Sequence, residues 1–212
     1  MTLGPGDEVL ASNHEYSALD RTWQFVCEAS GASYVRAPIE VPVRPSADVV
    51  EALWDAVTSR TRILFVSHVT SPTGIIFPIA ELASRARDSG IVTVVDGAHA
   101  PGQIPIDLGK LGVDVYSGNC RKWMIAPKGA AFLHVRAEVQ PLVEPLVVSW
   151  GWRSKRPGPS RFVDQHEWQG SRDVSAFLSV PSAGSSNHDH SKPRSRNARC
   201  ISLSTPRFRG KQ

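Results

Sequence analysis

Cysteine is scarce in this chain, and long apolar runs are missing altogether. The three cysteines, Cys27, Cys120 and Cys200, are too few and too scattered among 212 residues for a disulfide framework or a zinc site. No run approaches the roughly 18 apolar residues that a transmembrane helix needs. The first ten residues, MTLGPGDEVL, lack a basic region followed by an apolar stretch, so we expect no signal peptide. A protein of the reducing cytoplasm, without a metal site or membrane association, is the resulting expectation.

Basic charge is concentrated at one end of the chain, whose formal net charge is +4. Residues 184–212 contain seven Lys and Arg and one Asp, which leaves 17 basic and 19 acidic residues in the remainder. That remainder is slightly acidic, so its charge gives no reason to expect nucleic-acid binding. The segment 184–212 also lacks apolar periodicity and is rich in Ser, Arg and Asn, and we therefore expect a disordered basic tail. Nucleic-acid binding by this tail is a weaker alternative, because no aromatic residues are interleaved with the charges.

Strand and helix patterns alternate along residues 1–183, which we interpret as one domain. With 41% hydrophobic and 21% charged residues, the chain can bury a substantial core. Short, continuously apolar runs predict strands buried on both faces, and segments with helical periodicity lie between them. This alternation predicts an α/β fold with three αβα layers and a mainly parallel sheet. The expected strands are 8–12, 31–39, 63–66, 91–95 and 113–116, with another reached through Gly129 in the run WMIAPKGAAFLHV, and the expected helices are 17–30, 46–59 and 78–89.

Three chemically active side chains follow two successive strands in residues 91–123. Asp96 and His99 come just after strand 91–95, and Lys122 comes after the apolar run 113–116. In open α/β sheets, ligands bind at the edge outside the carboxyl ends of the strands. A carboxylate there can hold a protonated heteroaromatic nitrogen, and a lysine can form a Schiff base with an aldehyde, as pyridoxal phosphate requires. At a separation of about 3 Å and an effective dielectric constant near 20, the carboxylate and the protonated ring nitrogen would attract each other by at most roughly 5 kcal/mol.

Three motifs carry a family resemblance: DGAHAPG at 96–102, SGNCRKW at 117–123 and APKGAAFLHV at 126–135. They resemble the class V aminotransferase group of fold-type I pyridoxal phosphate enzymes, and most closely its isopenicillin N epimerase-like branch. The resemblance implies that Asp96 pairs with the pyridine nitrogen, that His99 approaches the ring hydroxyl, and that Lys122 carries the Schiff base. Arg121 stands where relatives usually have a histidine that contacts the cofactor phosphate. Arginine can also grip a phosphate bidentately.

The same resemblance implies further cofactor contacts. In NHEYSA, at 13–18, Tyr16 corresponds to the side chain that lies over the cofactor ring, although a tyrosine that covers the core is the alternative. Ser71 stands where relatives often carry an asparagine near the ring hydroxyl, and Asn119 is a further cofactor-binding candidate. Ser171 corresponds to a residue that approaches the phosphate of the neighbouring subunit. That last role requires a homodimer.

The resemblance covers residues 3–183 and corresponds to a large cofactor domain that is incomplete at both ends. It implies a pyridoxal phosphate-dependent enzyme that acts on an amino acid through Lys122 and is of the epimerase or aminotransferase type. Carbon–sulfur cleavage, as in cysteine desulfurases and lyases, is an alternative that ranks lower, because no later loop with a nucleophilic cysteine is present. A catalytically inactive fragment of such an enzyme is the other alternative.

Overall fold

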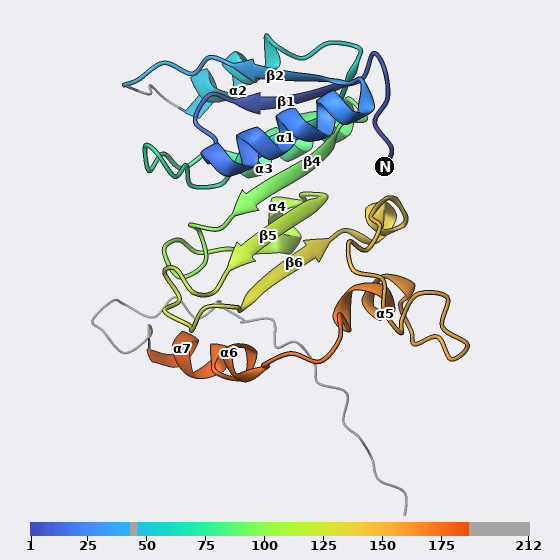
Figure 1. Cartoon of the computed structure of the whole chain (residues 1–212). Coiled ribbons are helices and arrows are strands. Elements are labelled where there is room, and N and C mark those ends of the chain that lie inside the picture. The colour runs from blue at the N-terminus through green and yellow to red at the C-terminus, as the bar shows by residue number, and fades with distance from the viewer. Residues whose placement is uncertain (43–45, 187–212) are drawn as a thin grey trace, which may run out of the picture.

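The structure, a computed structural model, describes residues 1–42 and 46–186 and contains a six-stranded sheet (Figure 1). The strand order is β2-β1-β3-β4-β5-β6, and all neighbouring pairs are parallel except β5 and β6. The predicted α/β fold with a mainly parallel sheet is therefore confirmed. The strands are β1 (Glu8–Ser12), β2 (Ser33–Ala37), β3 (Thr61–Ser67), β4 (Val92–Gly97), β5 (Val115–Asn119) and β6 (Ala131–Val135).

Helices cover both faces of the sheet and make the three layers. Successive strand residues point to opposite faces, so Phe65 packs beneath one layer while its neighbour Leu64 packs beneath the other. Helix α1 (Ser17–Ser30) covers the first face, and Figure 1 shows it in front of the sheet, with α3 behind. The second face carries the larger core and is covered by α2 (Ser46–Trp54), α3 (Ile79–Asp88) and α4 (Leu108–Leu111).

The predicted bounds agree with the structure for β1 and α1 and differ for other elements. Helix α1 ends, as expected, at Gly31, whose left-handed backbone (φ 74°) suits glycine. Helix α2 ends at Trp54 rather than at residue 59. The amides of Ala56 and Val57 bond to the carbonyls three residues earlier, so the last turn tightens and the helix stops.

The strands that carry the candidate site are also displaced from their predicted bounds. Strand β4 includes Asp96, which the sequence placed just beyond the strand. Strand β5 begins at Val115 rather than at residue 113. The cause is Asp114, whose buried carboxylate accepts hydrogen bonds from the backbone and hydroxyl of Thr93 and from Arg136. That side-chain network anchors the start of β5 to β4.

The segment after β6 contains helices that the sequence did not predict. After the antiparallel β6 come the 3-10 helix η1 (Ala137–Leu142), α5 (Arg161–Glu167), α6 (Ser175–Leu178) and α7 (Val180–Ser186). Helix α7 crosses the expected domain boundary at residue 183. Residues 187–212, most of the expected disordered tail, lie outside the described residues. In the described ranges, no helix is long and apolar enough to cross a membrane.

Gly97, at the end of β4, is packed against a buried aromatic ring. A Cβ at Gly97 would overlap the ring of Tyr116, which is fully buried and whose hydroxyl lies 2.8 Å from His68 Nδ1. We expect Gly97→Ala to lower the free energy of unfolding by about 1–3 kcal/mol, because neither ring can move without breaking this contact. Urea unfolding measures the change. Gly4→Ala is the control, because a Cβ there meets open space; equal stability of the two variants would contradict the packing.

Candidate functional site

The carboxylate of Asp96 lies at the end of the central strand β4. Its strand neighbours in register are Ser67 of β3 and Ser117 of β5. The residue is only 7% exposed, and Oδ1 accepts a hydrogen bond of 2.8 Å from the backbone of Ala98. Oδ2 accepts no hydrogen bond from the residues described in the structure. One oxygen is therefore fixed by the turn while the other can receive a partner.

Lys122 and Trp123 meet the two ring nitrogens of His99. The Lys122 amine lies 2.9 Å from Nε2, and the indole nitrogen of Trp123 lies 3.2 Å from Nδ1. Burial lowers the pKa of Lys122, while the Asp96 carboxylate opposes this change and Arg121 adds to it. Burial and the charge of Lys122 also lower the pKa of His99, against the influence of Asp96. Strands β4 and β5 thus bring Asp96, His99 and Lys122 together, as the sequence predicted.

Tyr16 joins the same group from the opposite end of the chain. It is the N-cap of α1, but its side chain makes no capping hydrogen bond and is 48% exposed. The Lys122 amine lies 6.0 Å from the centroid of the Tyr16 ring. The ring therefore faces the lysine rather than covering the core, the alternative that the sequence left open.

The other candidate residues are less closely joined to this group. Asn119 ends β5, and its side-chain oxygen accepts a 3.0 Å hydrogen bond from the backbone of Arg121, whose side chain is exposed. Ser71 is exposed in the turn that follows β3, and Ser171 is exposed in the loop before α6. In the described ranges, neither hydroxyl forms a hydrogen bond with Asp96, His99 or Lys122. Their predicted roles stay predictions.

A tight loop between β5 and β6 positions Lys122. The backbone of Cys120 bonds to both Ala126 and Ala130, which closes the loop at its base. Ile125 has a left-handed backbone (φ 60°), unusual for a β-branched residue. The apolar underside of the loop packs against α6 and α7 in a cluster made of Cys120, Met124, Ala126, Ala130, Phe132, Ala176, Phe177, Val180 and Ala183. Cys120 is a packed residue here, as the sequence indicated.

Glu15 is a part of the site that sequence reasoning did not find. Its carboxylate is buried and accepts hydrogen bonds from the hydroxyls of Ser12 and Ser67, the latter at 2.6 Å. Burial raises the pKa of Glu15 to about 7; the two serines oppose this shift, and the nearby Asp96 charge adds to it. The residue precedes Tyr16 in NHEYSA, but only the fold shows that β1 and β3 enclose it.

We expect Glu15 to make stability fall as pH rises from about 4.5 to about 7. In the unfolded chain the carboxyl ionises near 4.5, whereas in the folded chain it keeps its proton until about pH 7. This difference corresponds to roughly 3 kcal/mol at 1.36 kcal/mol per pH unit. Glu15→Gln imitates the protonated acid, so its free energy of unfolding should exceed that of the unsubstituted chain at pH 8 and approach it near pH 4.5.

Urea unfolding at several pH values measures this difference, with Glu28→Gln on the exposed side of α1 as the matched control. If Glu15→Gln and the unsubstituted chain differ in stability by the same amount at every pH between about 4.5 and 8, Glu15 does not hold a proton in the folded chain as predicted.

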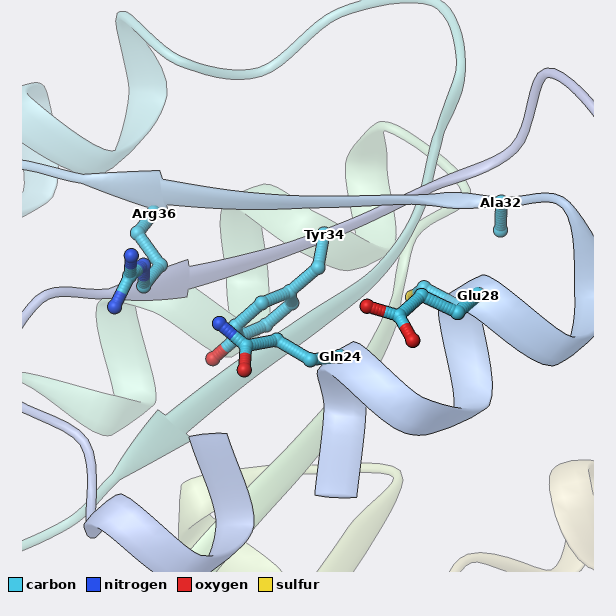
Figure 2. A pocket seen from close by; sticks show the side chains of 6 residues that line it. Gln24, Glu28, Ala32, Tyr34 and Arg36 are labelled. Atoms are coloured by element: carbon cyan, nitrogen blue, oxygen red, sulfur yellow. The ribbon is translucent and has the colours of Figure 1, made fainter. Parts of the chain in front are cut away.

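A separate hollow lies away from this site. Its volume is about 350 Å³. Figure 2 shows its lining, with Gln24 and Glu28 on α1 and Tyr34 and Arg36 on β2. The Tyr34 hydroxyl and the Arg36 guanidinium both bond to Asp20. Two of its polar groups are thus paired within the chain, and none of its lining residues belongs to the group of Asp96, His99 and Lys122 at the β4–β5 edge.

Comparison with known proteins shows which family the chain belongs to. The family model described as "Aminotransferase class-V" matches residues 1–155. Isopenicillin N epimerase from Amycolatopsis lactamdurans is 40% identical over 193 residues, which are 85% of this chain and 48% of that enzyme.

Solved structures have the same fold. The cysteine desulfurase CsdA from Escherichia coli is similar with a TM-score of 0.74 and 25% identity, over 89% of this chain and 47% of CsdA. A mutant of C-DES with glycine covalently linked to the PLP cofactor has a TM-score of 0.75 and 21% identity, over 89% of this chain and 51% of that one. The chain spans about half the length of the curated relatives it matches. It belongs to the class V aminotransferase family.

Proposed function

We propose that the chain binds pyridoxal phosphate at the β4–β5 edge and acts at the α-carbon of an amino acid, as an epimerase or aminotransferase does. One observation carries the proposal: the Lys122 amine lies against His99, at the strand ends where Asp96 offers a carboxylate oxygen that has no hydrogen-bond partner among the described residues. Family membership supports the same reaction class. The similarity to isopenicillin N epimerase favours epimerisation, in which a proton leaves and returns at one carbon.

The residues at this edge fit the cofactor. Pyridoxal phosphate, when bound, supplies an aldehyde that condenses with amines and a ring that withdraws electrons from the α-carbon. Asp96 Oδ2 can accept a hydrogen bond from a protonated ring nitrogen while Oδ1 stays bonded to Ala98. The side chain of Tyr16 makes no capping hydrogen bond to α1, and its ring faces Lys122. The ring therefore offers an aromatic face on which the cofactor can stack.

The other candidate residues have proposed roles in binding the cofactor or moving a proton. Lys122 holds the cofactor and, once its amine is released, moves the proton at the substrate α-carbon. His99 and Ser71 offer hydrogen bonds near the ring hydroxyl, and Asn119 is a further cofactor contact. Arg121 binds the phosphate in place of the usual histidine, and Ser171 reaches the phosphate of a partner subunit in a homodimer.

Two alternatives have support of their own. The similarity to cysteine desulfurase CsdA supports carbon–sulfur cleavage, which begins with the same proton removal. The match to only about half of each relative supports a chain that carries the cofactor site without catalytic activity.

Exchange of the substrate α-proton with solvent deuterium tests the shared first step. The chain is incubated with pyridoxal phosphate and a panel of L- and D-amino acids in deuterated water, and the α-proton signal is followed by NMR. We expect exchange for at least one amino acid. Accompanying racemisation, keto acid or sulfide would then identify epimerase, aminotransferase or lyase chemistry. No exchange with any amino acid, despite bound cofactor, would favour the inactive chain.

A further inference from the structure

Two contacts on His99 determine where its proton lies. The Trp123 indole nitrogen lies 3.2 Å from Nδ1, and the Lys122 amine lies 2.9 Å from Nε2. An indole N–H can only donate a hydrogen bond, so Nδ1 must accept and cannot carry a proton. A neutral imidazole carries one N–H. With Nδ1 excluded, that hydrogen lies on Nε2.

This tautomer also determines whether the Lys122 side chain is a neutral amine or a charged ammonium. The Nε2–H group is a donor directed at the lysine nitrogen, and an ammonium group has three donors and no acceptor. Only the neutral amine has the lone pair that can accept this hydrogen bond. The opposite arrangement, in which a lysine ammonium donates to Nε2, would move the imidazole hydrogen to Nδ1, where it would face the indole N–H. The contacts therefore favour the neutral amine.

We propose that Trp123 is a positioning residue that holds the His99 proton on Nε2 and thereby keeps the Lys122 amine neutral and nucleophilic. The tautomer of His99 and the neutral state of Lys122 follow from the contacts alone. Only the catalytic consequence, attack of the amine on the cofactor aldehyde, rests on the proposed function. Lys122 must be uncharged to attack an aldehyde, and the indole of Trp123 would secure that form through His99 without touching the reacting atoms.

The charged groups around Lys122 do not by themselves decide whether its amine is charged or neutral. Asp96, on β4, favours the charged forms of both Lys122 and His99, whereas burial and Arg121 favour the neutral lysine. From α1, the ring of Tyr16 lies 6.0 Å from the amine. Because these influences oppose one another, one hydrogen bond can decide which form of Lys122 predominates.

Nitrogen-15 NMR of histidine-labelled, cofactor-free protein tests the tautomer directly. We expect the His99 signals of the unsubstituted chain to report a protonated Nε2 and an unprotonated Nδ1. Trp123→Phe removes the donor and keeps an aromatic ring, so its His99 signals should shift toward a mixture of tautomers. Trp150→Phe is the matched control, because Trp150 is 86% exposed. A protonated Nδ1 in the unsubstituted chain would overturn the proposal without any variant.

Competitive acetylation of the amines, quantified by mass spectrometry over a range of pH, tests the consequence. Near neutral pH we expect Trp123→Phe to lower the labelling of Lys122 about threefold to tenfold, the effect of one lost hydrogen bond, and to raise its apparent pKa. Lys110, which is exposed, provides the internal reference. An unchanged Lys122 profile in a folded Trp123→Phe variant would refute the proposal. Neither experiment uses pyridoxal phosphate, so both are independent of whether the chain binds it.

Discussion

Replacing Lys122 with alanine is expected to abolish the near-ultraviolet and visible absorbance that the chain gains on binding pyridoxal phosphate. Lys122 is the lysine that the fold places against His99 and near Asp96 at the carboxyl edge of the sheet. A cofactor held through an amine loses its covalent attachment when that amine is removed. We also expect complete loss of α-proton exchange, because the same amine is proposed to move the proton.

Lys128→Ala is the matched control for this experiment. Lys128 is exposed in the same loop between β5 and β6, so its replacement reproduces the loss of a nearby positive charge. The Lys128 variant should retain the absorbance. A Lys122→Ala variant that keeps the band would show that another amine holds the cofactor.

Asp96→Asn is expected to produce the second large effect, a loss of α-proton exchange by at least about a hundredfold. Asparagine can keep the hydrogen bond from Ala98 to Oδ1, so the turn after β4 is preserved while the negative charge is lost. The attraction of roughly 5 kcal/mol between Asp96 and a ring cation sets an upper bound of about four orders of magnitude. The exchange rate by NMR and the cofactor affinity by titration measure the loss.

The Asp96 variant has a second readout that does not need the cofactor. Asp96 raises the pKa of Glu15 and of Lys122, so both pKa values should fall in Asp96→Asn. Asp55→Asn, at an exposed position after α2, is the control with the same change of charge. Exchange in Asp96→Asn at the rate of the Asp55 variant would remove Asp96 from the proposed role.

Elements of the fold could be predicted from the sequence where the local sequence pattern alone indicates the structure. Strand β3 could be predicted because its apolar residues run without interruption, as expected for a strand buried on both faces. The end of α1 could be predicted because Gly31 suits the left-handed conformation that stops a helix. Asp96, His99 and Lys122 were predicted to meet because parallel strands end at the same edge of a sheet.

The rest depends on contacts between distant segments. Glu15 looks like an ordinary surface carboxylate until β1 and β3 enclose it between Ser12 and Ser67. The role of Trp123 depends on the orientation of the His99 ring, which spacing along the chain does not define. Helices α6 and α7 are too short to carry a clear periodic pattern, and they form against the loop of Lys122 by tertiary packing.

The most direct test of a cofactor site built around Lys122 is reduction of the cofactor-loaded chain with borohydride, followed by peptide mapping. Reduction makes the lysine–cofactor bond permanent, so mass spectrometry can locate it. The account predicts one labelled peptide, with the cofactor on Lys122. Label spread over exposed lysines such as Lys110 and Lys128, or no label at all, would contradict it.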